Sequence, residues 1–222
     1  VLVLMDGLQK SGIEFVLTKH ENCAGFMAEG GYHADGAPGI LVATLGPGVA
    51  NAVNVVANAF QNRVPLIFLT GCVDADESLT YMHQVVDHSE LLKSVTKTSV
   101  TVVDGAVDVA IDKVLAIALD GQPGPVHVDL PISLAAKSQP KCEMIVRNSP
   151  APATPAEGVD LETARNWLLE AQRPLFIVGL DVLNQHAEKV VEQFSLEFRI
   201  PLITTYIAKG VLPEDDPLAL GG

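Results

Sequence analysis

Basic residues are scarce in this sequence. Lys and Arg number 14 against 27 Asp and Glu, which gives the 222 residues a formal net charge of -13. A protein that binds nucleic acid neutralises phosphates with clustered Lys and Arg. The composition therefore argues against a nucleic-acid partner. It does not exclude an anionic small molecule, because the local charge of a cleft can oppose the net charge of the protein.

Cysteine is scarce too, and no long apolar run is present. The three cysteines, Cys23, Cys72 and Cys142, are widely spaced and form no C-x-x-C pair. We therefore expect neither a disulfide framework nor a zinc site. No run approaches the about 18 apolar residues that span a bilayer, and residues 1–5 lack the charged start and the cleavage site of a signal peptide. We expect a cytoplasmic protein with no membrane partner.

The apolar residues that are present form short, regularly placed runs. They make up 48% of the chain, and charged residues make up 18%, which is enough to build a sizeable core. Runs that read as strands alternate with stretches of helical spacing. The expected strands are residues 14–18, 39–44, 65–70, 94–102 and 125–130, and the expected helices are 1–11, 22–34, 49–61, 82–92 and 107–119. Each crossover is long enough for a helix, which predicts a parallel α/β sheet.

The chain is longer than a usual single domain. We expect a first domain at 1–132, a linker at 133–158 and a partial second domain at 159–222. The linker contains Pro140, Pro150, Pro152 and Pro155, which favour a surface path. The second domain repeats the α/β pattern, with helices expected at 161–171 and 187–198 and strands at 174–178 and 201–204. Because position 1 is Val rather than Met, we expect the sequence to be an excerpt of a longer chain.

Glu21 follows the expected strand 14–18 and precedes small and apolar residues at helical spacing. It would therefore lie at the carboxyl end of a strand and at the start of a helix, where ligands bind in open α/β sheets. An acid at a helix start has a simpler explanation as well, since it complements the helix dipole. An isolated Glu would favour that simpler explanation.

Further motifs change this balance. The chain contains H-E-x-x-A-x-x-M-A-E-G from His20 to Gly30, L-G-P-G-V-A-N at 45–51, P-L-I-F-L-T-G at 65–71 and G-Q-P-G-P-V-H-V-D-L-P at 121–131. In this order and at this spacing they resemble thiamine-diphosphate-dependent enzymes of the acetolactate synthase, pyruvate oxidase and pyruvate decarboxylase type. The resemblance covers nearly the whole chain. It implies the pyrimidine-binding domain, six-stranded in the family with its first strand ahead of Val1, followed by part of a Rossmann-like central domain.

The resemblance also implies a cofactor site. It gives Glu21 the role of the glutamate that hydrogen-bonds N1′ of the aminopyrimidine and so activates the cofactor. Such a glutamate should have a raised pKa, and an apolar site flanked by Val16 and Leu17 would raise it. Gly46-Pro47-Gly48 would let the backbone pass close to the flat ring, although a strand-to-helix turn alone needs these residues. Asn51 matches an asparagine of the family and could equally serve helix packing or capping.

The positions of three histidines in the sequence suggest different roles. His83 and Gln84 fall where related enzymes carry a Phe-Gln or His pair that reaches the neighbouring subunit's site, but His83 is equally well explained as a surface or interface residue. His20 is expected to support Glu21 rather than to act in catalysis. His127 lies in a buried strand, which is typical of a hydrogen-bonded core histidine.

Other parts of the family's machinery are not expected on this stretch. No G-D-G motif with a later Asn is present, so we expect no metal ligand here and a magnesium and diphosphate site elsewhere. FAD is possible in the central domain of such enzymes, but residues 178–181, V-G-L-D, lack the second Gly of a G-x-G. The family implies a 2-oxo acid substrate in a lyase or transferase reaction, and a homodimer or tetramer. The helices after Glu21 and Gly48, rich in Ala, Gly and Val, are the expected dimer interface.

Two other classes of protein compete with this hypothesis. A non-catalytic α/β module could bind a nucleotide or mediate dimerisation alone, but it has no reason to keep an acid beside the Gly-Pro-Gly turn. A nicotinamide-dependent dehydrogenase should carry G-x-G-x-x-G after its first strand, and none of the expected strands is followed by that motif.

Overall fold

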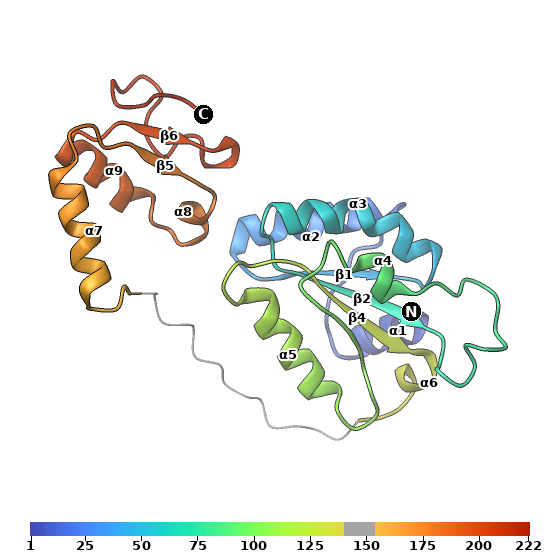
Figure 1. The fold of residues 1–222 in the computed structure, drawn as a ribbon. Coiled ribbons are helices and arrows are strands. Elements are labelled where there is room, and N and C mark those ends of the chain that lie inside the picture. The colour runs from blue at the N-terminus through green and yellow to red at the C-terminus, as the bar shows by residue number, and fades with distance from the viewer. Residues whose placement is uncertain (140–153) are drawn as a thin grey trace. The chain divides into compact units, whose positions relative to one another are not determined.

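The computed structural model describes residues 1–139 and 154–222. The chain divides into two compact units, Val1–Asn148 and Ser149–Gly222 (Figure 1). Most of the expected linker, residues 140–153, lies outside the described residues. Its beginning overlaps a short helix, α6, at Ile132–Ala135.

The first unit is an α/β domain with a wholly parallel sheet. Its strands lie in the order β1-β2-β4-β3, and each neighbouring pair is parallel. The prediction of a parallel α/β fold is confirmed. The elements are α1 Leu2–Lys10, α2 Glu21–Asp35, β1 Gly39–Ala43, α3 Pro47–Gln61, β2 Leu66–Cys72, α4 His88–Leu92, β3 Ser99–Thr101, α5 Val107–Leu119, β4 Val126–Pro131 and α6.

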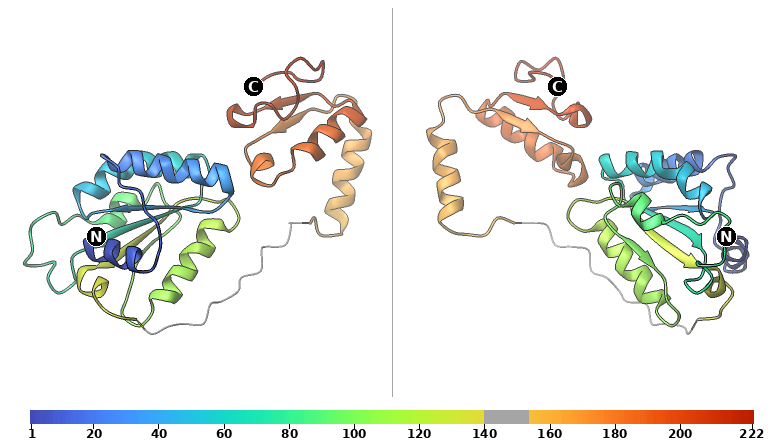
Figure 2. Two further views of the ribbon diagram at one scale, coloured as in Figure 1. Left: turned by 180° about the vertical axis from the view of Figure 1, so that it is seen from behind. Right: turned by 45° about the vertical axis from the view of Figure 1, so that its right-hand side comes forward.

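Helices cover both faces of this sheet. Helices α2 and α3 lie on one face and α5 on the other (Figures 1 and 2). Leu41 and Phe68 pack with Val55 of α3 in one core cluster, whereas Ile67 packs with Val114 of α5 in the other. Successive strand residues face opposite sides, so a strand covered on both faces must be apolar at nearly every position, as β2 is.

Helices α2 and α3 pack closely against each other. A Cβ at Gly25 would collide with the side chain of Val55, so the glycine lets the two backbones approach. One turn further, buried Glu29 accepts hydrogen bonds from Asn58 Nδ2 at 3.0 and 2.9 Å. A third bond, of 3.3 Å, comes from Asn62 Nδ2. These contacts fix α3, whose first residues form part of the candidate site.

The expected strand at 14–18 is wrong. These residues have no regular structure, and Phe15, Val16 and Leu17 are exposed. The described part of the sheet therefore has four strands rather than five. A strand requires a neighbour that takes up its backbone hydrogen bonds, and an apolar run does not reveal whether one is available. The edge position of β1 is consistent with this, since Ile40 is 60% exposed.

Two further elements are shorter than expected. The helix expected at 82–92 is present only as α4, since residues 73–87 form turns and bends. The strand expected at 94–102 is reduced to the three residues of β3. The helix expected at 107–119 coincides with α5, and the helix expected at 1–11 is α1, followed by Gly12 in the left-handed region at φ +73°.

The second unit is a small α/β assembly. It consists of α7 Val159–Glu170, β5 Phe176–Val178, α8 Asp181–Asn184, α9 Glu188–Phe198, β6 Leu202–Thr204 and the 3-10 helix η1 Tyr206–Ala208. Strands β5 and β6 are parallel, and the core includes Val178 and Leu202. The expected helices and strands of this unit are present with shifts of one or two residues; α8 and η1 are additional.

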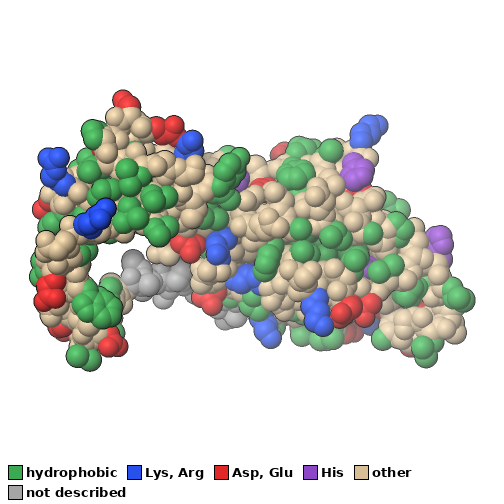
Figure 3. Space-filling view, turned by 45° about the horizontal axis from the view of Figure 1, so that its top comes forward, with side chains coloured by type: hydrophobic (Ala, Val, Ile, Leu, Met, Phe, Trp, Pro, Cys, Tyr) green, Lys and Arg blue, Asp and Glu red, His purple; other side chains and the backbone are tan. Residues whose placement is uncertain are grey.

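Large apolar side chains remain exposed on both units (Figure 3). Trp167 and Leu169 on α7 are 72% and 80% exposed. Despite this apolar surface, none of the helices in the described ranges has the combination of length and apolar sequence needed to cross a membrane.

Candidate active site

Glu21 is the first residue of α2. The preceding residue, His20, caps the helix, because its Nδ1 accepts a hydrogen bond from the backbone N–H of Asn22 at 3.2 Å. His20 thus fixes the start of the helix on which Glu21 lies, and its supporting role at the site stays a prediction. Glu21 is partly buried, whereas the flanking Val16 and Leu17 point to solvent. The apolar wall expected from those two residues is therefore absent in the single chain.

The Gly-Pro-Gly turn joins β1 to α3. Gly46 adopts φ +61°, in the region that disfavours any residue with a Cβ. A Cβ there would also collide with the backbone carbonyl of Gln84. Pro47 then occupies the first turn of α3, where its missing N–H costs nothing. The strand thus turns sharply and points the start of α3 toward Glu21.

Glu21, Gly48 and Asn51 come together at this turn. Asn51 Nδ2 donates a hydrogen bond of 3.1 Å to Oε2 of Glu21. A Cβ on Gly48 would lie 3.5 Å from Oε1 of the same carboxylate and 2.8 Å from Thr44 Cγ2. Oε1 accepts no hydrogen bond from the described residues. Glu21 and Asn51 therefore lie side by side at this turn, next to the buried Gly48, with Oε1 of the carboxylate available to a ligand.

This arrangement fits the edge of a flat aminopyrimidine. A ring nitrogen could share a proton with Oε1, and Gly48 adds no side chain of its own beside that oxygen. Glu21 and Asn51 would hold the ring edge, and Gly48 would border its face. The helix α3 adds the positive end of its dipole near the same place.

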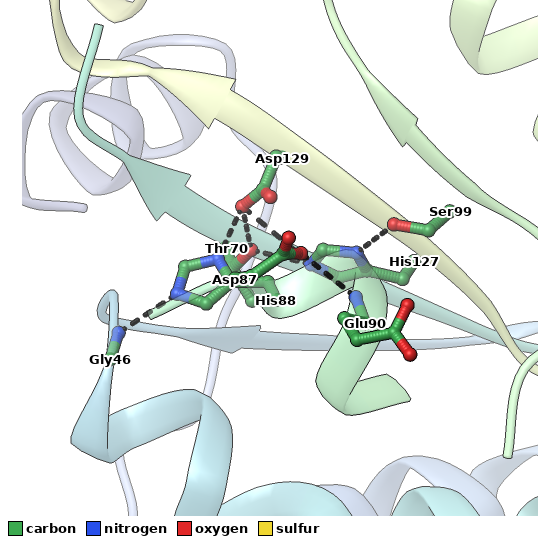
Figure 4. Close-up of polar contacts among 8 residues, drawn as sticks. All are labelled: Gly46, Thr70, Asp87, His88, Glu90, Ser99, His127 and Asp129. Atoms are coloured by element: carbon green, nitrogen blue, oxygen red, sulfur yellow. Dashed lines mark hydrogen bonds and ion pairs between the residues drawn. The ribbon is translucent and has the colours of Figure 1, made fainter. Parts of the chain in front are cut away.

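A buried chain of hydrogen bonds runs from β3 to the Gly46 turn (Figure 4). Ser99 Oγ lies 2.6 Å from His127 Nδ1, and His127 Nε2 lies 2.8 Å from Thr70 Oγ1. Thr70 Oγ1 donates to Asp129 Oδ1 at 2.6 Å. The same carboxylate oxygen lies 2.8 Å from His88 Nδ1. At the far end the N–H of Gly46 donates to His88 Nε2 at 3.0 Å.

Two bonds of this network have a fixed donor, Gly46 N–H to His88 and the Thr70 hydroxyl to Asp129, and they determine the direction of the others. Because His88 Nε2 accepts from Gly46, its proton is on Nδ1 and is donated to Asp129. Because the Thr70 hydroxyl donates to Asp129, it accepts from His127 Nε2–H, which leaves Nδ1 of His127 to accept from Ser99. The chain therefore contains two neutral imidazoles and one carboxylate.

Burial supports the neutral state of His127. The pKa of His127 is lowered to about 4, mainly by desolvation; the charge of Asp129 opposes this shift, and the neighbouring His88 adds a smaller lowering. His127 is fully buried, so the prediction of a hydrogen-bonded core histidine is confirmed. Burial also raises the pKa of the Cys72 thiol to about 12, with smaller contributions from the charges of Asp129 and Asp74.

His88, His127 and Asp129 are close enough together to be considered as metal ligands, since one ligand atom from each lies within 4.8 Å of the others. Both nitrogens of each imidazole already have a hydrogen-bond partner. A cation could bind only by breaking these buried bonds. The arrangement fits a hydrogen-bonded network better than a metal centre.

A cleft of about 520 Å³ opens at the carboxyl ends of β2, β3 and β4. Gln84 and His88 line it, together with Cys72 and Asp129. Glu21 and Asn51 do not. The carboxylate of Glu21, with its available Oε1 beside Gly48, is therefore a feature separate from this cleft.

His83 and Gln84 have different surroundings. Gln84 has φ +60° and packs its backbone against Gly46, which brings it next to the predicted site. His83 is exposed and does not line the cleft. Sequence reasoning missed Thr70, His88 and Asp129. The sequence signal for Asp129 was an acid inside an otherwise apolar strand, which requires a buried partner.

Residues 1–91 match the family described as thiamine pyrophosphate enzyme, N-terminal TPP binding domain. Residues 161–222 match its central domain. The chain belongs to the thiamine pyrophosphate enzyme family.

Individual relatives lie in the same family. The chain is 31% identical to a protein of Methanocaldococcus jannaschii named "Probable acetolactate synthase large subunit", over 100% of the chain and 38% of the relative. It is 32% identical to the mitochondrial acetolactate synthase catalytic subunit of Saccharomyces cerevisiae, over 99% and 34%. A third relative, named "Probable 2-ketoarginine decarboxylase", from Pseudomonas aeruginosa, is 32% identical over 99% and 40%. The chain thus spans well under half of the length of these relatives.

Proposed function

We propose that this chain is the pyrimidine-binding part of a thiamine-diphosphate-dependent enzyme that decarboxylates or joins 2-oxo acids, in the manner of acetolactate synthase. The observation that carries the proposal is the carboxylate of Glu21, which Asn51 holds by Oε2 and whose Oε1 is available beside Gly48. Family membership of both units supports it. A scaffold that only dimerised would not need a carboxylate oxygen free at that turn.

Thiamine diphosphate, when bound, supplies a thiazolium carbon that can lose its proton and attack a carbonyl group. Glu21 holds and shares a proton at N1′ of the aminopyrimidine. Asn51 orients the carboxylate by occupying Oε2, so that Oε1 faces the ring. The glycines of the Gly46-Pro47-Gly48 turn add no side chains of their own beside the carboxylate. Together these residues orient the ring and control one proton.

The residues described above would hold only the pyrimidine ring of the cofactor, so the active enzyme needs further binding groups. We propose that a second copy of the chain completes the site, so that the active form is a homodimer or a tetramer. Magnesium and the diphosphate group would be bound by residues beyond those of this chain, and FAD could occupy the central domain. Gln84 would lie at the substrate or subunit boundary, and His83 at the subunit surface.

The Glu21→Gln variant of the complete protein tests the proposal. Glutamine keeps the shape and can hydrogen-bond N1′, but it cannot share the proton. Loss of an acid–base partner costs about 10²–10⁴-fold, so hydrogen exchange at C2 of the bound cofactor should slow by that factor. Deuterium exchange with an acid quench and NMR measures the step directly.

A matched control is Glu14→Gln, which removes an exposed glutamate with the same change of charge. It should leave exchange unchanged. Exchange that is equally fast in Glu21→Gln and in the wild type would remove Glu21 from catalysis. A wild-type protein that binds no thiamine diphosphate would instead favour the non-catalytic module.

A further inference from the structure

The Gly46 turn is attached to the sheet by a side chain that the proposed chemistry does not use. His88 is buried, with 4% of its surface exposed, and it is the first residue of the short helix α4. Its ring spans the space between the turn and β4. Gly46 N–H donates to Nε2, and Nδ1 lies 2.8 Å from Asp129 Oδ1 (Figure 4).

The turn packs against the backbone of Gln84, but the buried N–H of Gly46 needs a hydrogen-bond acceptor as well. Gly46 lies in a region of φ and ψ that is open to glycine and therefore loses much entropy when fixed. Its N–H is buried and cannot use the regular α-helical bonds, because it precedes the first turn of α3. An unpaired buried N–H costs about 1–3 kcal/mol. The acceptor on His88 removes that cost only while the turn keeps its present geometry.

Asp129 determines which nitrogen of His88 accepts. A carboxylate at Nδ1 retains the ring proton there, so that Nε2 keeps its lone pair for Gly46. Thr70 donates to the same oxygen, which holds the carboxylate in place. Asp129 lies in strand β4, and Gly46 lies in the turn before α3. His88 therefore fixes the turn to a strand of the sheet.

We propose that His88 is a positioning residue for the cofactor site. With Asp129 fixing its tautomer, it holds the Gly46-Pro47-Gly48 turn in the shape that leaves room for the aminopyrimidine beside Glu21. This inference rests on the proposed function. It assigns His88 no contact with the cofactor or with the substrate.

Substitution of His88 by each of the two amide residues, Gln and Asn, tests its two hydrogen bonds one at a time. The amide of glutamine reaches the place of Nε2, so His88→Gln keeps an acceptor for Gly46 and loses the bond to Asp129. The amide of asparagine reaches only the place of Nδ1, so His88→Asn keeps a donor to Asp129 and loses Gly46. The two variants have the same charge and the same functional group. A role in packing or stability alone would make them equivalent, or would favour asparagine.

We expect thiamine diphosphate, added with Mg²⁺ to the complete protein, to bind about tenfold more weakly to His88→Asn than to the wild type. His88→Gln should stay within about threefold. Hydrogen–deuterium exchange of the Gly46 amide, measured without cofactor, should accelerate about tenfold in His88→Asn and little in His88→Gln. Equal behaviour of the two variants in both measurements, changed or unchanged, would overturn the inference.

A measurement on the wild type covers the case in which a variant fails to fold. The ¹⁵N chemical shifts of His88 should show a protonated Nδ1 and an unprotonated Nε2. A proton on Nε2 would overturn the inference, because Gly46 could then no longer donate to it. If the wild-type protein binds no thiamine diphosphate, the proposed function fails, and the inference fails with it. If it binds and the two variants behave alike, only the inference fails.

Discussion

Asn51 Nδ2 donates a hydrogen bond of 3.1 Å to Oε2 of Glu21. The bond connects the second turn of α3 to the first residue of α2. It occupies one oxygen of the carboxylate and leaves the other for a ligand. The position of Glu21 is therefore determined by a neighbour as well as by its own helix.

Replacing this neighbour should slow cofactor activation. A hydrogen bond to a charged group is worth about 1.5–3 kcal/mol, so Asn51→Ala should slow C2–H exchange by about 10–100-fold. Asn54→Ala, an exposed asparagine in the next turn, should have no effect. If Asn51 acts through Glu21, adding Asn51→Ala to Glu21→Gln should cost much less than Asn51→Ala does alone. If the two substitutions slow exchange by fully additive free energies, Asn51 does not act through Glu21.

Substitution of Glu29 should lower the stability of the fold without affecting cofactor activation. Glu29 is buried and accepts bonds from Asn58 and Asn62. Glu29→Ala leaves these amides without their acceptor, so the free energy of unfolding should fall by about 1–3 kcal/mol. Denaturant titration measures this. Asp6→Ala, which breaks an exposed ion pair with Lys10, is the control and should change little. Equal losses in the two variants would contradict the interpretation.

The lowered pKa of His127 allows a prediction of how the free energy of unfolding depends on pH. Its pKa is lowered to about 4 in the folded protein, against about 6.5 in an unfolded chain. Between these values the unfolded chain binds a proton that the folded protein does not, so this contribution to stability is present above pH 6.5 and is lost as the pH falls toward 4. The difference corresponds to about 3 kcal/mol.

The His127→Gln variant isolates this contribution. Carboxyl groups titrate in both proteins, so the difference between the two curves reports on His127 alone. We expect the free energy of unfolding of the wild type to fall more steeply from pH 6.5 to pH 4 than that of the variant. Parallel curves would mean that the buried imidazole takes up its proton without unfolding.

Cys72 should be chemically inert in the folded protein. Its pKa of about 12 leaves almost no thiolate at pH 8, and the thiolate is the form that reacts. Alkylation by iodoacetamide, followed by peptide mapping, should be at least about 100-fold slower in the native protein than in guanidinium chloride. The denatured protein serves as its own control. Similar rates in the two states would show that the thiol is neither buried nor influenced by Asp129.

The sequence predicts the part of the site that local chemistry specifies. The Gly-Pro-Gly turn and the helix start at Glu21 depend on residues adjacent in the chain, and Asn51 lies one turn beyond. The strand expected at 14–18 is wrong because strand formation depends on a partner elsewhere. The bond from Gly46 to His88 spans 42 residues and crosses the irregular loop 73–87. No periodicity or motif connects those positions, so only the folded chain reveals it.

The exposed face of α2 leads to the last prediction. Phe26 and Met27 are 46% and 53% exposed in the single chain, on the helix that begins at Glu21. If a second copy completes the cofactor site there, these side chains are buried in the dimer, and a charge at either position would lose its solvation.

Phe26→Glu should therefore weaken dimerisation by at least about 30-fold, since an unpaired charge buried in an interface costs about 2 kcal/mol or more. Val109→Glu is the matched control, because Val109 is 59% exposed on α5, which covers the other face of the sheet. Sedimentation velocity over a range of protein concentrations measures the dissociation constant. A Phe26→Glu protein that remains as dimeric as the wild type would show that α2 does not face the second copy. Dissociation caused by Val109→Glu would instead place the interface on the side of α5, and the site at Glu21 would need a different explanation for its open half.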